Sequence, residues 1–192
     1  MIYDEKYYTS ENYVNYLDRQ EKYRKTAEEI NELLKKIGMI DKSKKVLDYG
    51  CAVGFMSKAL LELGYDVDSY DISEWALEQA RQKGCHVVSK PETHYHTGFF
   101  MDVLEHMENK DIDEMFSKIS FDYMVVRIPV SHESEPNKFF LEVSRKDPTH
   151  INCATTETWI KRFHNWGYSN CLRLNLNTIY DSTGCFCAII LK

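Results

Sequence analysis

The sequence predicts an α/β protein with a doubly wound, mostly parallel β-sheet. Apolar segments of strand length alternate with segments in which apolar residues recur every three or four positions, which is typical of repeated strand–helix units. At residues 46–55 one such strand runs directly into a turn of small residues and then into a helical pattern. The chain closes with two strand patterns joined by a hairpin turn at residues 181–184, so we expect the last strand to be antiparallel.

Residues 1–40 are expected to form a helical cap that contains one long helix over residues 12–37. Apolar residues recur at spacings of four and three from Tyr23 to Ile37, and Gly38 suits the end of the helix. The strands expected next cover residues 45–49, 65–71 and 86–89. Helices are expected between them, one over residues 55–63 and one that Ser73 caps and Gly84 ends.

The second half of the chain repeats this alternation. Strands over residues 99–103 and 121–130 flank a helix over residues 110–118. Residues 131–154 are the one long irregular stretch, and long loops in compact domains are often functional. A helix over residues 155–166 should follow, with Trp159, Ile160 and Phe163 facing inward, and then strands over residues 170–180 and 185–191.

Composition limits the classes of function. With 192 residues we expect a single domain, residues 1–192, that buries a sizeable core. A formal charge of −6, without a run of lysine or arginine, argues against a nucleic-acid partner. The longest apolar run, residues 186–191, is far too short to span a bilayer, and no apolar signal region opens the chain. We therefore expect a cytoplasmic protein without membrane partners, while its oligomeric state is not predicted.

Two carboxylates are expected at one edge of the sheet. Asp48 lies at the end of a strand, two residues before Gly50, and the small residues that follow let the backbone approach a ligand closely. Asp71 ends the next strand, and α/β sheets bind nucleotides where neighbouring parallel strands end. A dinucleotide fingerprint would need a small residue where the chain has Phe55, and it gives Asp48 no role.

The segment Asp-Tyr-Gly-Cys-Ala-Val-Gly at residues 48–54 resembles the D-x-G-x-G-x-G loop of class I S-adenosylmethionine-dependent methyltransferases of the small-molecule type. Residues 101–106, Met-Asp-Val-Leu-Glu-His, and residues 147–151, Asp-Pro-Thr-His-Ile, are similar to two further segments of that family. The resemblance covers roughly residues 45–192 and implies a Rossmann-like methyltransferase fold with a seven-stranded sheet. The fold would be shortened between strands three and four, where only residues 86–98 are available.

The resemblance also implies which residues hold the methionine half of S-adenosylmethionine. Gly50, Cys51, Ala52 and Gly54 would line it, and Asp48 would lie near its amino group. Ala52 stands where the family usually has glycine. If that position needs a positive φ, the strain is about 1 kcal/mol.

The other half of the cofactor would contact residues from later in the chain. Asp71 would accept both ribose hydroxyls, and Ile72 would pack on the adenine. Met101 and Asp102 would flank the sulfonium. The tyrosine-rich residues 3–8 resemble a segment that folds over the cofactor in some sugar-modifying members.

Transfer of a methyl group to a hydroxyl requires that the hydroxyl loses its proton. Histidine, with an ordinary pKa near 6.5, suits this work, so His106 and His150 are the candidate catalytic bases. No metal site is predicted, because His94 and His96 have no acidic or cysteine partner at a matching spacing.

The predicted enzyme moves a methyl group from S-adenosylmethionine to a small polar acceptor, with S-adenosylhomocysteine as the product. A hydroxyl of a sugar or related metabolite is the favoured acceptor. A methyltransferase that acts on a macromolecule stays an alternative, although the short acidic chain counts against it. A non-catalytic partner subunit that binds S-adenosylmethionine is the other, motivated by Ala52 and the shortened crossover.

Overall fold

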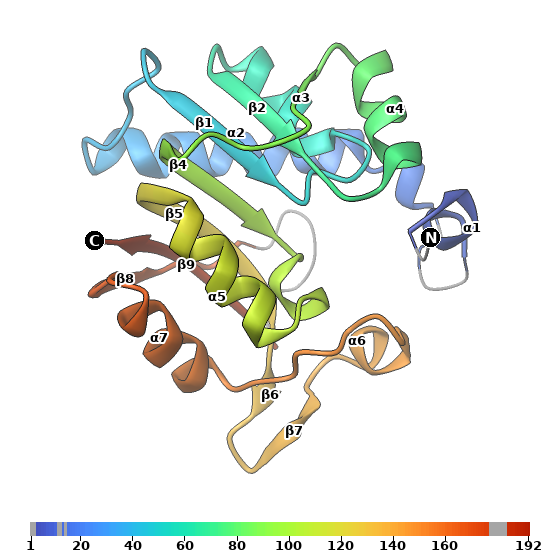
Figure 1. Cartoon of the computed structure of the whole chain (residues 1–192), viewed down its shortest axis with the longest axis vertical. Helices are drawn as coiled ribbons and strands as arrows, with labels where there is room; N and C mark the ends of the chain where they lie inside the picture. The colour runs from blue at the N-terminus through green and yellow to red at the C-terminus, as the bar shows by residue number, and fades with distance from the viewer. Residues whose placement is uncertain (1–2, 11–12, 14, 177–183) are drawn as a thin grey trace. The chain divides into compact units, whose positions relative to one another are not determined.

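The computed structural model describes residues 3–10, 13, 15–176 and 184–192, which fall into two compact units (Figure 1). The first unit holds the described residues up to Pro91 and Leu176, and the second holds Glu92 to Asn175 together with the last residues from Gly184. Seven strands make up the mostly parallel sheet with an antiparallel C-terminal strand, which confirms the predicted α/β fold class. The prediction of a single domain over residues 1–192 stays a prediction.

The first unit contributes three parallel strands in the order β3-β2-β1. These are β1 (Lys45–Tyr49), β2 (Asp66–Tyr70) and β3 (His86–Val87). Its helices are α1 (Glu5–Tyr8), α2 (Gln20–Lys36), α3 (Phe55–Glu62) and α4 (Glu74–Gln82), with a 3-10 turn, η2 (Tyr16–Asp18). Because Tyr49 pairs with Tyr70, β1 and β2 end side by side, and the residues that follow them share one edge of the sheet.

The long N-terminal helix begins later than predicted. Asn15 has a left-handed backbone with φ +55°, which interrupts a helix, and η2 follows it before α2 starts at Gln20. Residues 11, 12 and 14 of the predicted helix lie outside the described residues. The end of the helix is confirmed, since α2 stops just before Gly38, whose φ is +72°.

The second unit contributes four strands in the order β4-β5-β9-β8. β4 (His94–Met101) and β5 (Ser120–Pro129) are parallel, whereas β9 (Cys185–Leu191) is antiparallel to β5 and to β8 (Asn170–Arg173). The helices are η3 (Leu104–His106), α5 (Asn109–Lys118), α6 (Glu142–Lys146) and α7 (Thr156–Asn165). Figure 1 shows β8 and β9 side by side near the C-terminus, with α7 next to β8.

Two predictions about strands in this unit were wrong in extent. β4 starts at His94 rather than at residue 99. Its first residues alternate, with His94 exposed, His96 partly exposed, and Tyr95 and Thr97 buried, and this short pattern was not predicted as a strand. The strand predicted over residues 170–180 ends at Arg173, and residues 177–183, which include most of the predicted hairpin turn, lie outside the described residues. The short connection between strands three and four is confirmed, since β3 ends at Val87 and β4 begins at His94.

Residues 131–154 are more regular than the sequence predicts. They contain a small hairpin of β6 (Ser131–His132) and β7 (Glu135–Phe139), followed by α6. Further on, Trp159 and Phe163 of α7 are buried as predicted, but Ile160 is exposed and was wrongly placed inside. No helix within the described ranges is long and apolar enough to cross a bilayer.

Candidate functional site

The loop after β1 has a left-handed backbone at three positions. The φ angles are +75° at Gly50, +47° at Ala52 and +80° at Gly54. A Cβ atom on Gly54 would lie 2.8 Å from Ala80 Cβ and 2.9 Å from Cys85 Sγ, so only glycine fits there. Ala52 does adopt the positive φ that the sequence left open, at a cost of about 1 kcal/mol.

Hydrogen bonds within the protein fix the shape of this loop. The N–H groups of Gly50 and Cys51 both donate to the carbonyl oxygen of Tyr70, at 2.8 and 3.0 Å. The N–H of Ala52 donates to Asp71 Oδ2 at 2.8 Å. These three donors are already used, so the loop offers a ligand a close surface rather than a set of open N–H groups.

Asp71 is held in place at the end of β2. Its Oδ1 accepts the N–H of Ser73 at 2.8 Å, and its Oδ2 accepts that of Ala52. Burial raises the pKa of Asp71, while these backbone hydrogen bonds oppose the rise. Each carboxylate oxygen can accept a further hydrogen bond. The next residue, Ile72, has 63% of its surface exposed, which is high for a large apolar side chain.

Asp48 is a buried carboxylate on β1 with only 2% of its surface exposed. The Ser57 hydroxyl donates to Asp48 Oδ2 at 2.5 Å, and the Ser69 hydroxyl donates to Ser57 Oγ at 2.8 Å. Burial raises the pKa of Asp48 to about 7, although the hydrogen bonds from Ser57 oppose it. No cationic side chain is among the groups that shift the pKa of Asp48 in the described part of the chain.

The N-terminal tyrosines lie against the end of β2. Tyr8 of α1 is buried and stacks on Trp75 of α4, with ring centroids 5.4 Å apart and planes 20° apart. The carbonyl oxygen of Tyr3 accepts a hydrogen bond from the Ser73 hydroxyl. Burial, and then the charge of Asp71, raise the pKa of the Tyr8 phenol.

In the second unit, Asp102 follows β4 with a left-handed backbone at φ +57°. Its N–H donates to the carbonyl oxygen of Arg127 at 2.8 Å, and its carboxylate pairs with the Arg127 guanidinium. Arg127 is 2% exposed and also donates to Cys185 Sγ at 3.3 Å. The pair explains how a charged side chain is accommodated in the apolar strand β5. Met101, which directly precedes Asp102 and is the last residue of β4, is buried.

The two predicted catalytic histidines come together, although they are far apart in the sequence. The rings of His106 and His150 meet edge to face, with centroids 4.5 Å apart. Main-chain hydrogen bonds hold their segments together, because the N–H groups of Ile151 and Asn152 both donate to the carbonyl oxygen of Glu105, at 3.0 and 2.9 Å.

The hydrogen bonds of Thr149 define the state of His106. The Thr149 hydroxyl donates its proton to Asp147 Oδ1 at 2.6 Å, so its oxygen accepts from His106 Nδ1 at 2.9 Å. Burial, and then the neighbouring His150, lower the pKa of His106 to about 4. His106 is therefore neutral at physiological pH and carries its lone pair on Nε2.

Sequence reasoning missed Glu105, which adjoins His106 on η3. Its side chain has no exposed surface, and neither carboxylate oxygen has a hydrogen-bond partner in the part of the chain that the structure describes. Burial raises the pKa of Glu105 well above its usual range. The sequence feature that could have indicated Glu105 is an acidic residue directly before a histidine, after the apolar residues Val103 and Leu104.

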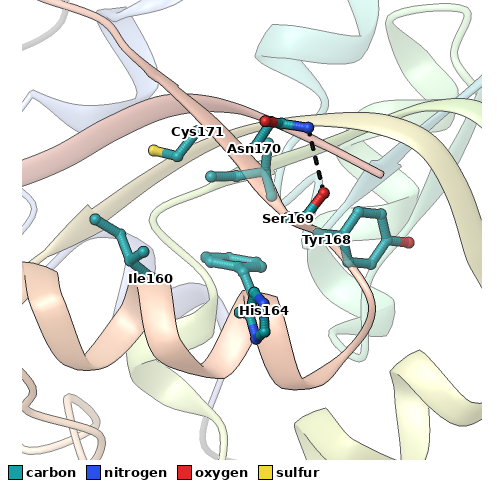
Figure 2. A pocket seen from close by; sticks show the side chains of 8 residues that line it. Ile160, His164, Tyr168, Ser169, Asn170 and Cys171 are labelled. Atoms are coloured by element: carbon teal, nitrogen blue, oxygen red, sulfur yellow. Dashed lines mark hydrogen bonds between the residues drawn. The ribbon is translucent and has the colours of Figure 1, made fainter.

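A small hollow lies apart from these residues, between α7 and β8 (Figure 2). Its volume of about 50 Å³ has room for a few water molecules only. Figure 2 shows Ile160, His164 and Cys171 on its walls, and the Ser169–Asn170 hydrogen bond of 3.2 Å beside it. None of the predicted site residues lines this hollow, so it is not the candidate site.

A family model described as a methyltransferase domain matches residues 17–172. The chain belongs to this methyltransferase family. Among solved structures, a SAM-dependent methyltransferase from Archaeoglobus fulgidus is similar to it, with 20% identity and a TM-score of 0.62 over 92% of this chain and 99% of that one.

Magnesium protoporphyrin IX methyltransferase from Synechocystis, solved with bound SAH, is similar with 18% identity and a TM-score of 0.61. That match covers 89% of this chain and 84% of the other. At such identities the likeness shows the fold, which is that of the class I S-adenosylmethionine-dependent methyltransferases.

The predicted site residues of this methyltransferase fall into two groups. The first unit gathers Asp48, the loop at residues 50–54, Asp71 and Ile72 where β1 and β2 end. The second unit holds residues 101–106 and His150. That all of them contact one cofactor and one acceptor stays a prediction.

Proposed function

We propose that this methyltransferase transfers the methyl group of S-adenosylmethionine to a hydroxyl of a small polar acceptor, such as a sugar or related metabolite. The observation that carries the proposal is the pair of carboxylates at the ends of β1 and β2, next to the left-handed loop, whose Ala52 N–H donates to Asp71. Bound S-adenosylmethionine would supply an electrophilic methyl group on its sulfonium.

The residues at the end of β2 fit the nucleoside part of the cofactor. Asp71 is held by an N–H group on each oxygen, and each oxygen keeps a lone pair for one of two adjacent ribose hydroxyls. Exposed Ile72 supplies an apolar surface for a purine ring. Tyr8 and Trp75 pack beside this end of the strand and limit the access of water.

Asp48 fits the charged part of the cofactor. A buried carboxylate with a raised pKa gains from a nearby positive charge, and the α-ammonium group of S-adenosylmethionine would provide one. Its charge would lower the pKa of Asp48 and keep the side chain ionised. Gly54 lets the loop after β1 pack closely against Ala80 and Cys85, where a Cβ atom would not fit.

The second unit supplies groups suited to an acceptor hydroxyl. Neutral His106 carries a lone pair on Nε2, which can hold the proton that the hydroxyl loses, and His150 lies against its ring. Methyl transfer also requires that the attacking oxygen is held in line with the bond that breaks. Main-chain hydrogen bonds between η3 and residues 151–152 give these side chains a fixed frame.

The cofactor is tested by calorimetric titration with S-adenosylmethionine, S-adenosylhomocysteine and NAD. We expect the first two to bind and NAD not to bind. Asp71→Asn should weaken the binding of S-adenosylmethionine and of S-adenosylhomocysteine by at least tenfold. It removes the negative charge from the two proposed hydrogen bonds to the ribose hydroxyls, and a hydrogen bond to a charged group is worth about 1.5 to 3 kcal/mol. Asp66→Asn, at the exposed start of the same strand, is the matched control and should bind normally. Tight NAD binding without S-adenosylmethionine binding would overturn the proposal.

The acceptor is tested with a methyl donor that carries an isotopic label. Pools of sugars and polyols, of phenols, of RNA and of protein are incubated separately, and label is counted in each. We expect transfer into the sugar and polyol pool. Label in RNA or protein instead would favour a macromolecular acceptor. Cofactor binding without transfer to any pool would favour the non-catalytic alternative.

A further inference from the structure

Three potential metal ligands meet inside the second unit. Glu105, His106 and His150 each present one ligand atom, and these atoms lie within 4.8 Å of one another. His106 Nε2 is 4.0 Å from Glu105 Oε1. The ligands of a tetrahedral zinc ion lie about 3.4 Å apart, so small side-chain shifts would bring the three atoms to coordination distance.

Two of the three side chains have buried atoms whose hydrogen-bonding capacity is unused. Both carboxylate oxygens of Glu105, and Nδ1 of His150, have no hydrogen-bond partner across the described ranges of the chain. A buried polar group without a partner costs about 1 to 3 kcal/mol, and native proteins usually satisfy such groups. A bound cation would satisfy the carboxylate of Glu105 directly.

His106 is already oriented as metal-binding histidines usually are. Such a ligand commonly donates its second ring N–H to an oxygen, which fixes the tautomer and the ring plane. Here Nδ1 donates to Thr149, whose hydroxyl in turn donates to Asp147, and Nε2 faces Glu105. The chain of hydrogen bonds leaves the lone pair on the nitrogen nearest the carboxylate.

The segments that carry the three side chains are held together. Asn152 donates from its side chain to the Met107 carbonyl and to Asn109 Oδ1, both at 3.0 Å, and accepts from Arg162 at 2.9 Å. Its N–H donates to the carbonyl oxygen of Glu105. The cluster is therefore built on a constrained frame rather than on mobile surface side chains.

We propose that Glu105, His106 and His150 bind a divalent cation. Two imidazole nitrogens and one carboxylate oxygen suit zinc, or manganese, iron(II) and cobalt(II), better than calcium or magnesium, which prefer sets of oxygen ligands. Three protein ligands leave at least one coordination position open for water or for another oxygen.

The open position suggests how the site serves the proposed function, and this step rests on that function. A hydroxyl of the acceptor bound to the cation would lose its proton more readily, because a cation lowers the pKa of a bound oxygen. Both histidines then act as ligands rather than as bases. The acceptor would be a molecule whose hydroxyl can approach a buried cation.

The test measures metal binding without cofactor or acceptor. Protein stripped with a chelator, in a Cys171→Ser background that removes an exposed thiol, is titrated with Zn²⁺ and with Mg²⁺, and Co²⁺ binding is followed by its visible spectrum. We expect about one Zn²⁺ per chain and weaker Mg²⁺ binding. Glu105→Gln and His150→Ala should each weaken Zn²⁺ binding at least tenfold and alter the Co²⁺ spectrum.

The matched control is His94→Ala with His96→Ala. These two histidines lie in the same unit, close to Asp122, and outside the cluster. The control should bind Zn²⁺ like the parent protein, and circular dichroism melts establish that every variant is folded. A Zn²⁺ site that survives Glu105→Gln and His150→Ala but is lost in this control would overturn the proposal, as would the lack of saturable binding.

The same measurements separate the two proposals. Saturable Zn²⁺ binding that depends on Glu105, without methyl transfer to any acceptor pool, would overturn the proposed function but not the metal site. Methyl transfer that is unchanged in chelator-stripped protein which also binds no Zn²⁺ would overturn the metal site alone.

Discussion

Asp48→Asn should stabilise the protein without ligand and weaken cofactor binding. The Asp48 carboxyl is buried, and burial raises its pKa from 3.8 to about 7. In the unfolded chain the group ionises near 3.8, so between these values the folded state binds more protons than the unfolded state. The free energy of unfolding contributed by Asp48 therefore falls as the pH rises from about 4 through about 7.

The size of the effect follows from the two pKa values. Each pKa unit corresponds to about 1.36 kcal/mol, so the shift destabilises the folded protein by roughly 4 kcal/mol once the group is fully ionised. Between about pH 5 and about pH 8.5 the change is roughly 2 to 3 kcal/mol. Asparagine keeps the shape and can still accept the hydrogen bond from Ser57, but it does not titrate.

The assay is urea unfolding of both proteins at about pH 5 and about pH 8.5. The wild type should lose more stability than the variant over this interval, by roughly 2 to 3 kcal/mol. Calorimetry should show that Asp48→Asn binds S-adenosylmethionine more weakly, since the cation of the ligand loses its buried counter-charge. Equal pH dependence of the two proteins would refute the argument from burial.

Asp68→Asn is the matched control. Asp68 is as buried as Asp48 and lies on the neighbouring strand β2, but Lys45 Nζ is 3.5 Å from its Oδ2, and His86 Nδ1 donates to its Oδ1 at 2.9 Å. Asp68→Asn removes the negative charge that Lys45 and His86 contact, so it should lower the free energy of unfolding. If both variants are stabilised at about pH 8.5, nearby positive charge is not what distinguishes the two carboxylates.

Three further predictions concern particular positions. Ala52→Gly should raise the unfolding free energy by up to about 1 kcal/mol, because it relieves the positive φ, whereas Gly54→Ala should lower it by about 1 to 3 kcal/mol through steric overlap; urea unfolding of both variants checks the contrast. Arg127→Met should cost about 3 to 5 kcal/mol, because it leaves Asp102 without its partner, and a cost under 1 kcal/mol in the same assay would contradict this. Thr149→Val keeps the side-chain shape but removes the acceptor for the His106 ring; it should weaken Zn²⁺ binding roughly 10-fold and lower the unfolding free energy by about 1 to 3 kcal/mol, and unchanged affinity would exclude that orienting role.

The parts of the site that were predictable from the sequence are those encoded locally. A strand, a small-residue turn and a helix follow one another over residues 45–62, so the left-handed loop and Asp48 could be located from spacing alone. Asp71 followed from the same rule applied to the next strand. The fold class was predictable for a related reason, since alternating strands and helices leave few topologies.

The parts that were not predictable depend on contacts between distant segments. The Glu105 side chain is buried, and within the described residues its carboxylate accepts no hydrogen bond. The segment that hydrogen-bonds to its main chain, residues 151–152, lies far along the sequence. The orienting role of Thr149 needs His106 beside it, more than forty positions earlier in the chain. The start of α2 was misplaced because a left-handed Asn15 breaks an apolar pattern that otherwise continues.

The Tyr70 carbonyl oxygen, which accepts two N–H groups of the loop after β1, links folding to ligand recognition. A shift of one residue in the pairing of β1 with β2 would remove this acceptor and would turn Asp71 to the other face of the sheet. If Asp71 binds the ribose as proposed, a chain with that error would lose this contact, and only correctly registered molecules would gain the full binding energy of the cofactor. A higher cofactor concentration would then increase the population of molecules in which the parallel strands have the correct register.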